Sequence, residues 1–359
     1  MNIRPILSIA VVLFFATMFA SCTKVEMEAP SVKDAAEIRF GAMNELSSKP
    51  KTKSPADFDS RVVVAQDPAE SRSFGLDVAV SDGIEMPRLG APLTKGTQVV
   101  GINAFDVAAF FYADASSLDG SLLFTETVTD GYTENTYYWP SFGVMNFVAL
   151  YPTGILGVGN YDNRGNGIQT IADDSGRLQS FSYEIPSAVE QHQDVMVAVT
   201  KGVNNAETGE AVPMNFKHLL SAVRFKVGKM LATRINTLTI SGVKGGVVTI
   251  SYNSENDRWE YDPSSDNVSY SPIYSVDGVP NIDTYGLAEG NYITSNDNGM
   301  VMFVMPQTLS GAKIHINYTE LITGTTHDVN TTLAEHSWVA GQTNTYVINI
   351  NTETLQITI

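Results

Sequence analysis

The chain has 359 residues, of which 17% are charged and 43% are apolar, and its formal net charge is −17. The apolar content can form a core, so the chain is not disordered throughout, and the excess of acidic residues excludes a nucleic-acid-binding protein. The single cysteine excludes a disulfide framework and any multi-cysteine metal site, and the length predicts about two domains.

Residues 1–21 predict a secretory signal peptide. Arg4 supplies a positive charge, and an uncharged apolar stretch from Ile6 to Ala20 is too short to be a typical membrane-spanning helix. Ala20 and Ser21 then precede Cys22, the only cysteine, as in a bacterial lipobox. We therefore predict that Cys22 is lipidated and anchors the mature chain in the outer membrane. The alternative is an ordinary signal peptide followed by an incidental cysteine.

Residues 22–72 predict a tether or propeptide region. They are rich in Pro, Ser and Lys and have little apolar periodicity, apart from a short strand expected at Glu37 to Phe40.

Strand-like runs dominate the chain from about residue 74 onward. Many alternate with a period of two and are separated by Gly, Asn, Asp and Pro clusters. In one run, Ile235 is predicted to face away from Leu238 and Ile240. Many short strands without an alternation of strands and helices predict an all-β protein of Greek-key sandwiches. The predicted strands are 74–80, 105–112, 122–127, 136–139, 145–151, 194–200, 222–227, 237–241, 246–252, 300–305, 313–318, 328–332, 345–350 and 354–359.

A polar break at 201–212 predicts the domain boundary, because no strand pattern crosses it and both sides are rich in strands. The expected domains are an N-terminal sandwich at 73–205 and a C-terminal sandwich at 206–359.

The motifs favour no catalytic, cofactor-binding or metal site. The five histidines lack the spacing of metal-binding pairs, and no phosphate-binding loop or nucleophile elbow is present. Segment 162–167 is rich in oxygen ligands, but Arg164 stands where a calcium loop needs a ligand. Trp139, Trp259 and Trp338 could line a carbohydrate groove, although buried anchors in sandwich cores are the commoner role.

Several local patterns together resemble the fimbrillin-like families of Bacteroidetes, which include fimbrium subunits. The run Phe216-Lys217-His218-Leu219-Leu220 continues into an alternating strand. Two other patterns precede it, at 147–152 and 194–198, and three follow it, at 305–307, 338–341 and 346–350. From the residues themselves we expect His218 to be a hydrogen-bonded structural histidine and Pro306 to end a strand.

The resemblance implies two transthyretin-like β-sandwich domains in tandem, export as a lipoprotein, and assembly with other fimbrial subunits into a surface fimbrium. It also implies that a trypsin-like protease cuts after a basic residue in the N-terminal region. A strand is then lost, and a strand from another subunit takes its place by β-augmentation.

We predict that this maturation cut falls between Lys95 and Gly96, in a small-residue, turn-rich segment that would free a strand at about 74–81. Arg72 and Arg88 are competing sites. The donor strand is predicted at the chain's end, where Leu355, Ile357 and Ile359 alternate with polar residues.

Two alternatives stay open. The chain could be a surface lipoprotein that binds a glycan or a host surface protein without polymerising, or one that anchors or tips a fimbrium. It could also be a glycan-active enzyme on a sandwich scaffold, which would need a convergent carboxylate pair.

Overall fold

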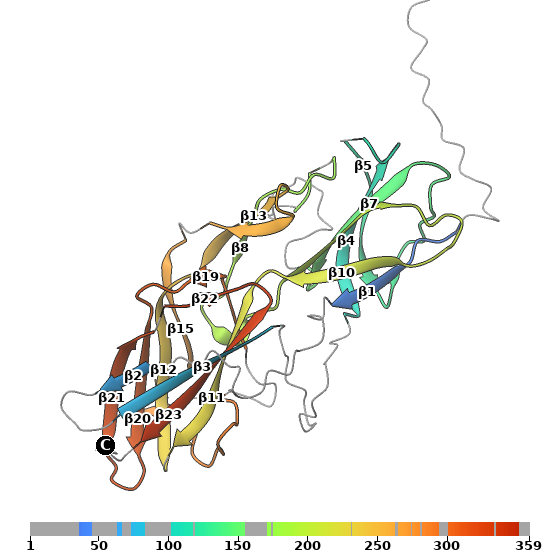
Figure 1. The fold of residues 1–359 in the computed structure, drawn as a ribbon. Coiled ribbons are helices and arrows are strands. Elements are labelled where there is room, and N and C mark those ends of the chain that lie inside the picture. Colours follow the sequence, from blue (N-terminus) through green and yellow to red (C-terminus); the bar gives the residue numbers. More distant parts are fainter. Residues whose placement is uncertain are drawn as a thin grey trace, which may run out of the picture. The chain divides into compact units, whose positions relative to one another are not determined.

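A computed structural model describes residues 36–44, 63–66, 73–82, 102–154, 171–293 and 301–351, apart from 118, 174, 231, 263–264, 274, 281 and 334. These residues form strands connected by turns (Figure 1). The one helical element described is a 3-10 turn, η2 (Val189–Gln191), so the all-β class is confirmed. The described part contains no helix long and apolar enough to cross a membrane.

The first sheet has seven strands in the order β1-β10-β9-β7-β4-β5-β6. Their bounds are β1 Phe40–Asn44, β4 Ala104–Tyr112, β5 Ser121–Thr129, β6 Tyr132–Thr133, β7 Val144–Tyr151, β9 Met196–Val203 and β10 Val212–His218. Both faces of the interior strand β4 are covered, which explains its nearly continuous apolar sequence. Phe105, Val107 and Ala109 belong to one core, whereas Ala108 and Phe110 belong to a second, larger core.

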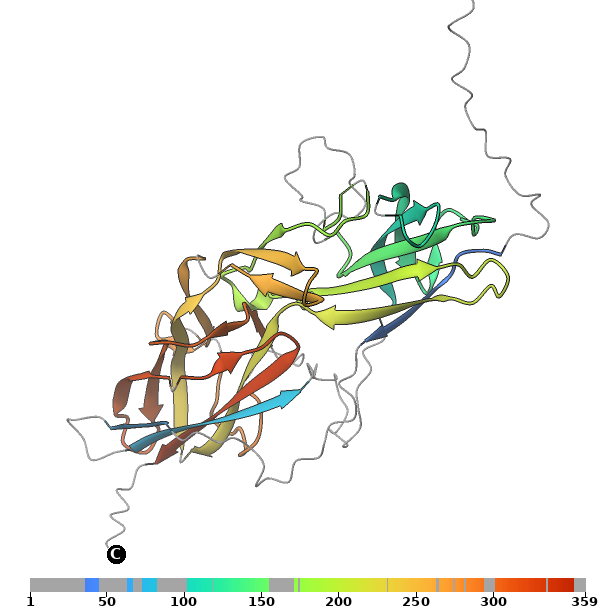
Figure 2. The same ribbon diagram turned by 45° about the horizontal axis from the view of Figure 1, so that its top comes forward.

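The second sheet has five strands in the order β18-β11-β23-β3-β2. Their bounds are β2 Val63–Gln66, β3 Ser73–Asp82, β11 Ser221–Met230, β18 Met302–Val304 and β23 Gln342–Asn351. Figure 2 shows the blue β3 beside the red β23, although these two strands come from opposite ends of the sequence.

Two further sheets complete the larger core. One has the order β15-β12-β20-β21 and the other β14-β13-β8. Their bounds are β8 Phe181–Glu184, β12 Thr233–Lys244, β13 Val247–Asn253, β14 Arg258–Tyr261, β15 Asn267–Ile273, β20 Lys313–Glu320 and β21 Thr326–Thr332. Two short ladders pair β16 (Ser275–Val276) with β17 (Val279–Pro280) and β19 (Gln307–Thr308) with β22 (Ser337–Trp338).

Most predicted strands are present in the described residues. The run 136–139 is different: it makes one isolated bridge, between Tyr138 and Glu37, and no strand. The predicted strand 354–359 lies outside the described residues. Pro306 stands between β18 and β19, which confirms the strand end expected there.

The predicted boundary segment, 201–212, spans the end of β9 and the loop to β10. Both strands belong to the seven-stranded sheet. The chain passes to the five-stranded sheet between β10 and β11, at Leu219–Leu220. A polar hairpin loop and an interdomain linker have the same composition, so the sequence pattern did not separate them. In addition, β3 pairs with β23 and not with strands of 102–203.

The predicted faces of the 235–241 run are wrong at one position. The pairing of β12 with β20 shifts between Ile235 and Thr237, and Ile235 is therefore buried together with Leu238 and Ile240. One extra residue in a strand moves the following side chains to the opposite face, which a strict period of two does not allow for.

Candidate strand-exchange site

The predicted functional residues all lie outside the described part of the chain: Cys22, Lys95, Gly96, Leu355, Ile357 and Ile359. The strands next to them in sequence are described. β1, β2 and β3 precede the predicted cut, and β23 precedes the predicted donor. β1, β2 and β3 show what the chain upstream of the predicted cut contributes to the fold.

Residues 36–44, which we call the closing segment, are bound on both sides. β1 runs parallel to β10 (Figure 1). In the register of the two strands, Phe40 is opposite Val212. On the other side, three backbone hydrogen bonds join the segment to residues 131–139, which include β6 at the opposite edge of the sheet. They run from Ile38 N–H to the Tyr137 carbonyl (2.8 Å), from Phe40 N–H to the Gly131 carbonyl (2.9 Å), and from Trp139 N–H to the Ala36 carbonyl (3.0 Å). The segment therefore joins the two edges of the seven-stranded sheet.

The closing segment also fills the smaller core. Ile38 is 2% exposed and Phe40 is 5% exposed. The Phe40 ring meets the rings of Phe105 and Phe147 edge-on, with centroids 6.0 and 5.5 Å away. Burial of these two side chains contributes about 3–6 kcal/mol. Loss of the segment would expose this core and leave β10 with an unpaired edge.

Gly131 allows this close approach. A Cβ atom at this position would lie 2.7 Å from the Phe40 carbonyl oxygen, and the Gly131 φ of +89° disfavours other residues. The turn at Gly131 is therefore shaped to receive the closing segment.

β3 is an upstream strand that completes the five-stranded sheet, where it lies between β23 and β2. It pairs with β23 antiparallel over ten residues, from Ser73 opposite Asn351 to Asp82 opposite Gln342. Val78 is 6% exposed and stands opposite the fully buried Tyr346. On its other side β23 pairs with β11, so removal of β3 and β2 would turn a central strand into an edge strand.

The core beside β23 contains a buried, hydrogen-bonded hydroxyl group, that of Tyr346. The Tyr346 hydroxyl accepts a hydrogen bond from Trp338 Nε1–H (3.0 Å) and lies 2.8 Å from His336 Nε2. Burial raises the pKa of Tyr346 far above its ordinary value, so the phenol stays neutral. Trp338 is 1% exposed and Trp139 is 2% exposed, so both are core residues and neither can form a carbohydrate platform.

The five histidines have structural contacts, and His218 is hydrogen-bonded as expected. None of the five shares a partner with another in the contacts described: His192 with the Pro186 carbonyl and Phe303 N–H, His218 with Asp194, His315 with Asp328, His327 with Glu320, and His336 with Tyr346. No group of three or more His, Cys, Asp or Glu side chains in the described residues could hold a metal ion.

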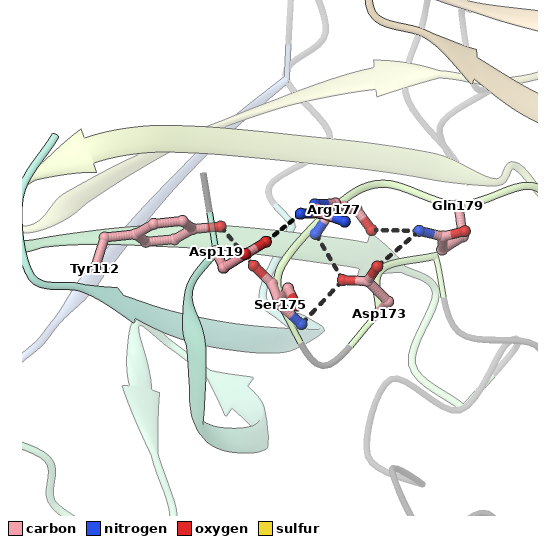
Figure 3. Close-up of polar contacts among 6 residues, drawn as sticks. All are labelled: Tyr112, Asp119, Asp173, Ser175, Arg177 and Gln179. Carbon is pink, nitrogen blue, oxygen red and sulfur yellow. Dashed lines mark hydrogen bonds and ion pairs between the residues drawn. The ribbon is translucent and has the colours of Figure 1, made fainter. Parts of the chain in front are cut away.

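A polar cluster near β4 and β5 is the turn shown in Figure 3. Asp173 accepts hydrogen bonds from Ser175 N–H (2.9 Å), Arg177 N–H (3.0 Å) and Gln179 Nε2 (3.0 Å). Arg177 forms an ion pair with Asp119, and Tyr112 donates to the Ser175 carbonyl (2.9 Å). These contacts hold a turn against the sheet.

Residues 22–72 contribute β1 and β2 to two sheets, which their tether-like composition does not predict. A short strand was expected at Glu37 to Phe40, and the structure places Ile38 and Phe40 in the core. The alternation of Ile38, Phe40 and Ala42 was the available signal. For β10, the corresponding signal was Val212, Met214 and Phe216, which are all buried.

Comparison with solved structures finds proteins described as putative cell adhesion proteins and as fimbrial proteins. A putative cell adhesion protein from Bacteroides ovatus is 12% identical, with 71% of this chain and 89% of that chain covered and a TM-score of 0.39. A putative cell adhesion protein from Bacteroides fragilis is 12% identical, with 90% and 100% covered and a TM-score of 0.35. The tip fimbrial protein Mfa3 from Porphyromonas gingivalis is 10% identical, with 65% and 78% covered and a TM-score of 0.34.

No curated protein matches the chain. The assignment rests on a family model described as Fimbrillin-like, which matches residues 94–359, well over half of the sequence. The match begins downstream of β1, β2 and β3. The chain therefore belongs to the fimbrillin-like family, and this membership supports a role as a fimbrial subunit.

Proposed function

We propose that this protein is a structural or adhesive subunit of a cell-surface fimbrium and that it assembles by strand exchange. The observation that carries the proposal is that strands upstream of the family match complete two sheets. The closing segment joins the edges of one sheet, and β3 covers β23 in the other.

A proteolytic cut between β3 and β4 would leave the upstream strands β1, β2 and β3 held to the rest of the molecule by non-covalent contacts alone. Cleavage between Lys95 and Gly96 is such a cut, and so is cleavage after Arg88. Cleavage after Arg72 would instead leave β3 attached to the rest of the chain and release only β1 and β2. A strand from another subunit would then pair with the exposed backbone and bury apolar side chains in the vacated places. The proposed donor carries Leu355, Ile357 and Ile359.

The proposed export route is that of a lipoprotein, with Cys22 as the acylated residue. Cys22→Ser should abolish labelling by a palmitate analogue and shift the protein out of the membrane fraction. Retained labelling of that variant would show that Cys22 is not the site of acylation.

A reversible lock on β3 tests strand exchange. Ala79 and Thr345 are directly opposite in the antiparallel register, a spacing that suits a disulfide. The full chain with Cys22→Ser, Ala79→Cys and Thr345→Cys is treated with a trypsin-like protease, and the new N-terminus is sequenced. Polymers should be absent under oxidising conditions and should form after reduction, because only reduction lets the cut segment leave.

Each single-cysteine variant is the matched control and should polymerise under both conditions. An N-terminus at Gly96 would support the proposed cut. If cut and reduced protein stays monomeric, strand exchange is wrong, and a non-polymerising anchor or tip lipoprotein that binds a host protein or glycan becomes the better function. The family membership favours both of these over a glycan-active enzyme.

A further inference from the structure

We propose that the end of the molecule at which β23 finishes is a docking surface for a second copy of this chain. The inference rests on the proposed function, because it follows from where the donor segment would leave the fold. Its evidence is a set of apolar side chains at this end that face solvent, which we call the apolar end: Val276 (57% exposed), Val279 (66%), Tyr285 (60%) and Ile322 (85%).

Backbone pairing places these residues near one another. β23 reaches this end at Ile350, which is opposite Met230 at the end of β11. The chain then turns into β12, and the Ala232 carbonyl in that turn accepts Leu321 N–H (2.8 Å). Ile322 is therefore adjacent to the turn that follows β11. β12 lies beside β20 (Figure 1). Glu320, at the end of β20, is opposite Thr233 at the start of β12, and the turn that carries Ile322 follows directly.

The other three side chains cluster around the start of β12. Ser275, in the β16–β17 hairpin, donates its hydroxyl to the Asn236 carbonyl (2.9 Å), and Val276 and Val279 are paired across that hairpin. Arg234 forms an ion pair with Asp283 (3.1 Å), two residues before Tyr285. The hairpin, Tyr285 and the Ile322 turn thus surround the same end of the four-stranded sheet.

Turns at the ends of strands are usually polar, and adjacent exposed apolar side chains mark interaction sites. The β16–β17 turn itself follows the usual rule, since Asp277 and Gly278 supply its positive φ angles of 52° and 78°. The apolar residues on either side of this turn are therefore not needed to form it.

The occupant follows from the spacing between β23 and the proposed donor. β23 ends at Asn351 and the donor run begins at Thr354, so three Cα steps separate them. Three steps span at most about 11 Å. If residues 354–359 pair with another copy, the surface of that copy must lie against the end at which β23 finishes. The side chains that it would cover first are those of the apolar end.

Single charge substitutions test this docking surface. Full-length protein carrying Ile322→Asp or Val279→Asp is cut with the maturation protease, and polymer growth is followed by light scattering. We expect growth to slow by about tenfold or more, since a buried apolar contact is replaced by a desolvated charge. Val247→Asp is the matched control: Val247 is 61% exposed but lies on β13, and its replacement should leave growth unchanged. Unaltered thermal unfolding of the uncut variants excludes misfolding as the cause.

A protein lacking residues 352–359 separates this inference from the proposed function. If the deletion blocks growth while Ile322→Asp and Val279→Asp grow like the wild type, the donor is retained and the docking surface is wrong. If the protein lacking residues 352–359 polymerises like the wild type, the proposed donor is wrong, and the docking surface inferred from it is wrong as well. Hydroxyl-radical footprinting gives a direct measurement: Tyr285 and Ile322 should be protected in polymers relative to monomers, whereas Val247 should not.

Discussion

At the scale of single residues, the missing side chain of Gly131 allows the backbone of the closing segment to pack directly against the turn at this position. Gly131→Ala puts a Cβ atom 2.7 Å from the Phe40 carbonyl oxygen and also carries the cost of a φ of +89°. We expect it to lower the free energy of unfolding by about 2–4 kcal/mol, measured by denaturant titration.

Gly290 provides the control for Gly131. Its φ is +87°, but a Cβ atom added there would meet no other atom within 4 Å. Gly290→Ala therefore carries the conformational cost alone, about 1 kcal/mol. Equal effects of the two substitutions would contradict a close approach of the closing segment to Gly131.

His192 makes stability depend on pH. Its Nε2–H donates to the Pro186 carbonyl (2.8 Å), and its Nδ1 accepts Phe303 N–H (3.1 Å), so the imidazole is neutral. Burial lowers the pKa of His192 to about 4. In the unfolded chain the group titrates near its ordinary value of about 6.5. Between these values only the unfolded state binds the proton, so the free energy of unfolding falls as the pH drops.

The His192 contribution can be isolated by substitution. Between pH 7 and pH 4.5, the wild type should lose about 2 kcal/mol more of its free energy of unfolding than His192→Gln, which has no proton to gain. Denaturant titrations at the two pH values measure the difference. An identical loss in both proteins would show that His192 is not held neutral.

At the scale of elements, β3 is the strand whose attachment can be weakened separately. Val78 is 6% exposed on β3, whereas Val80 on the same strand is 37% exposed. Val78→Asp buries a charge opposite Tyr346 and should detach β3 at a cost of about 2–4 kcal/mol, whereas Val80→Asp should cost less than about 1 kcal/mol. Hydrogen exchange reads this out: β23 amides that face β3 should lose protection in Val78→Asp, and those that face β11 should keep it.

If the β23 amides on both sides lose protection equally, β3 is not a separable strand and the five-stranded sheet unfolds as a unit. Val80→Asp, on the same face of β3 but more exposed, is the comparison that excludes a general effect of added negative charge.

At the scale of the whole molecule, the two halves of the chain are joined differently from the predicted linker. The loop between β9 and β10 connects two strands of one sheet, and the passage to the next sheet occurs at Leu219–Leu220. A site-specific protease sequence inserted after Glu207 should therefore give a nicked protein whose two fragments elute together at native size. Separation of the fragments without denaturant would instead support a domain boundary at 201–212.

The sequence predicted the strand class because period-two runs and turn residues are local features, and most runs from 105 to 350 became strands. It did not predict the partners of those strands. The face of Ile235 was missed because a register shift depends on the neighbouring strand. The composition of 201–212 likewise did not indicate that β9 and β10 pair in one sheet, because a solvated loop within a sheet and a linker are both polar.

The amino-acid sequence by itself determined the all-β class, the structural role of His218, and the resemblance that the family match confirmed. These follow from local alternation, from residue chemistry and from motif order. Only the tertiary structure decided that residues 36–44 and 73–82 complete two different sheets. Strand pairing joins residues more than a hundred positions apart, and its energy comes from shared hydrogen bonds and burial that neither strand contains alone.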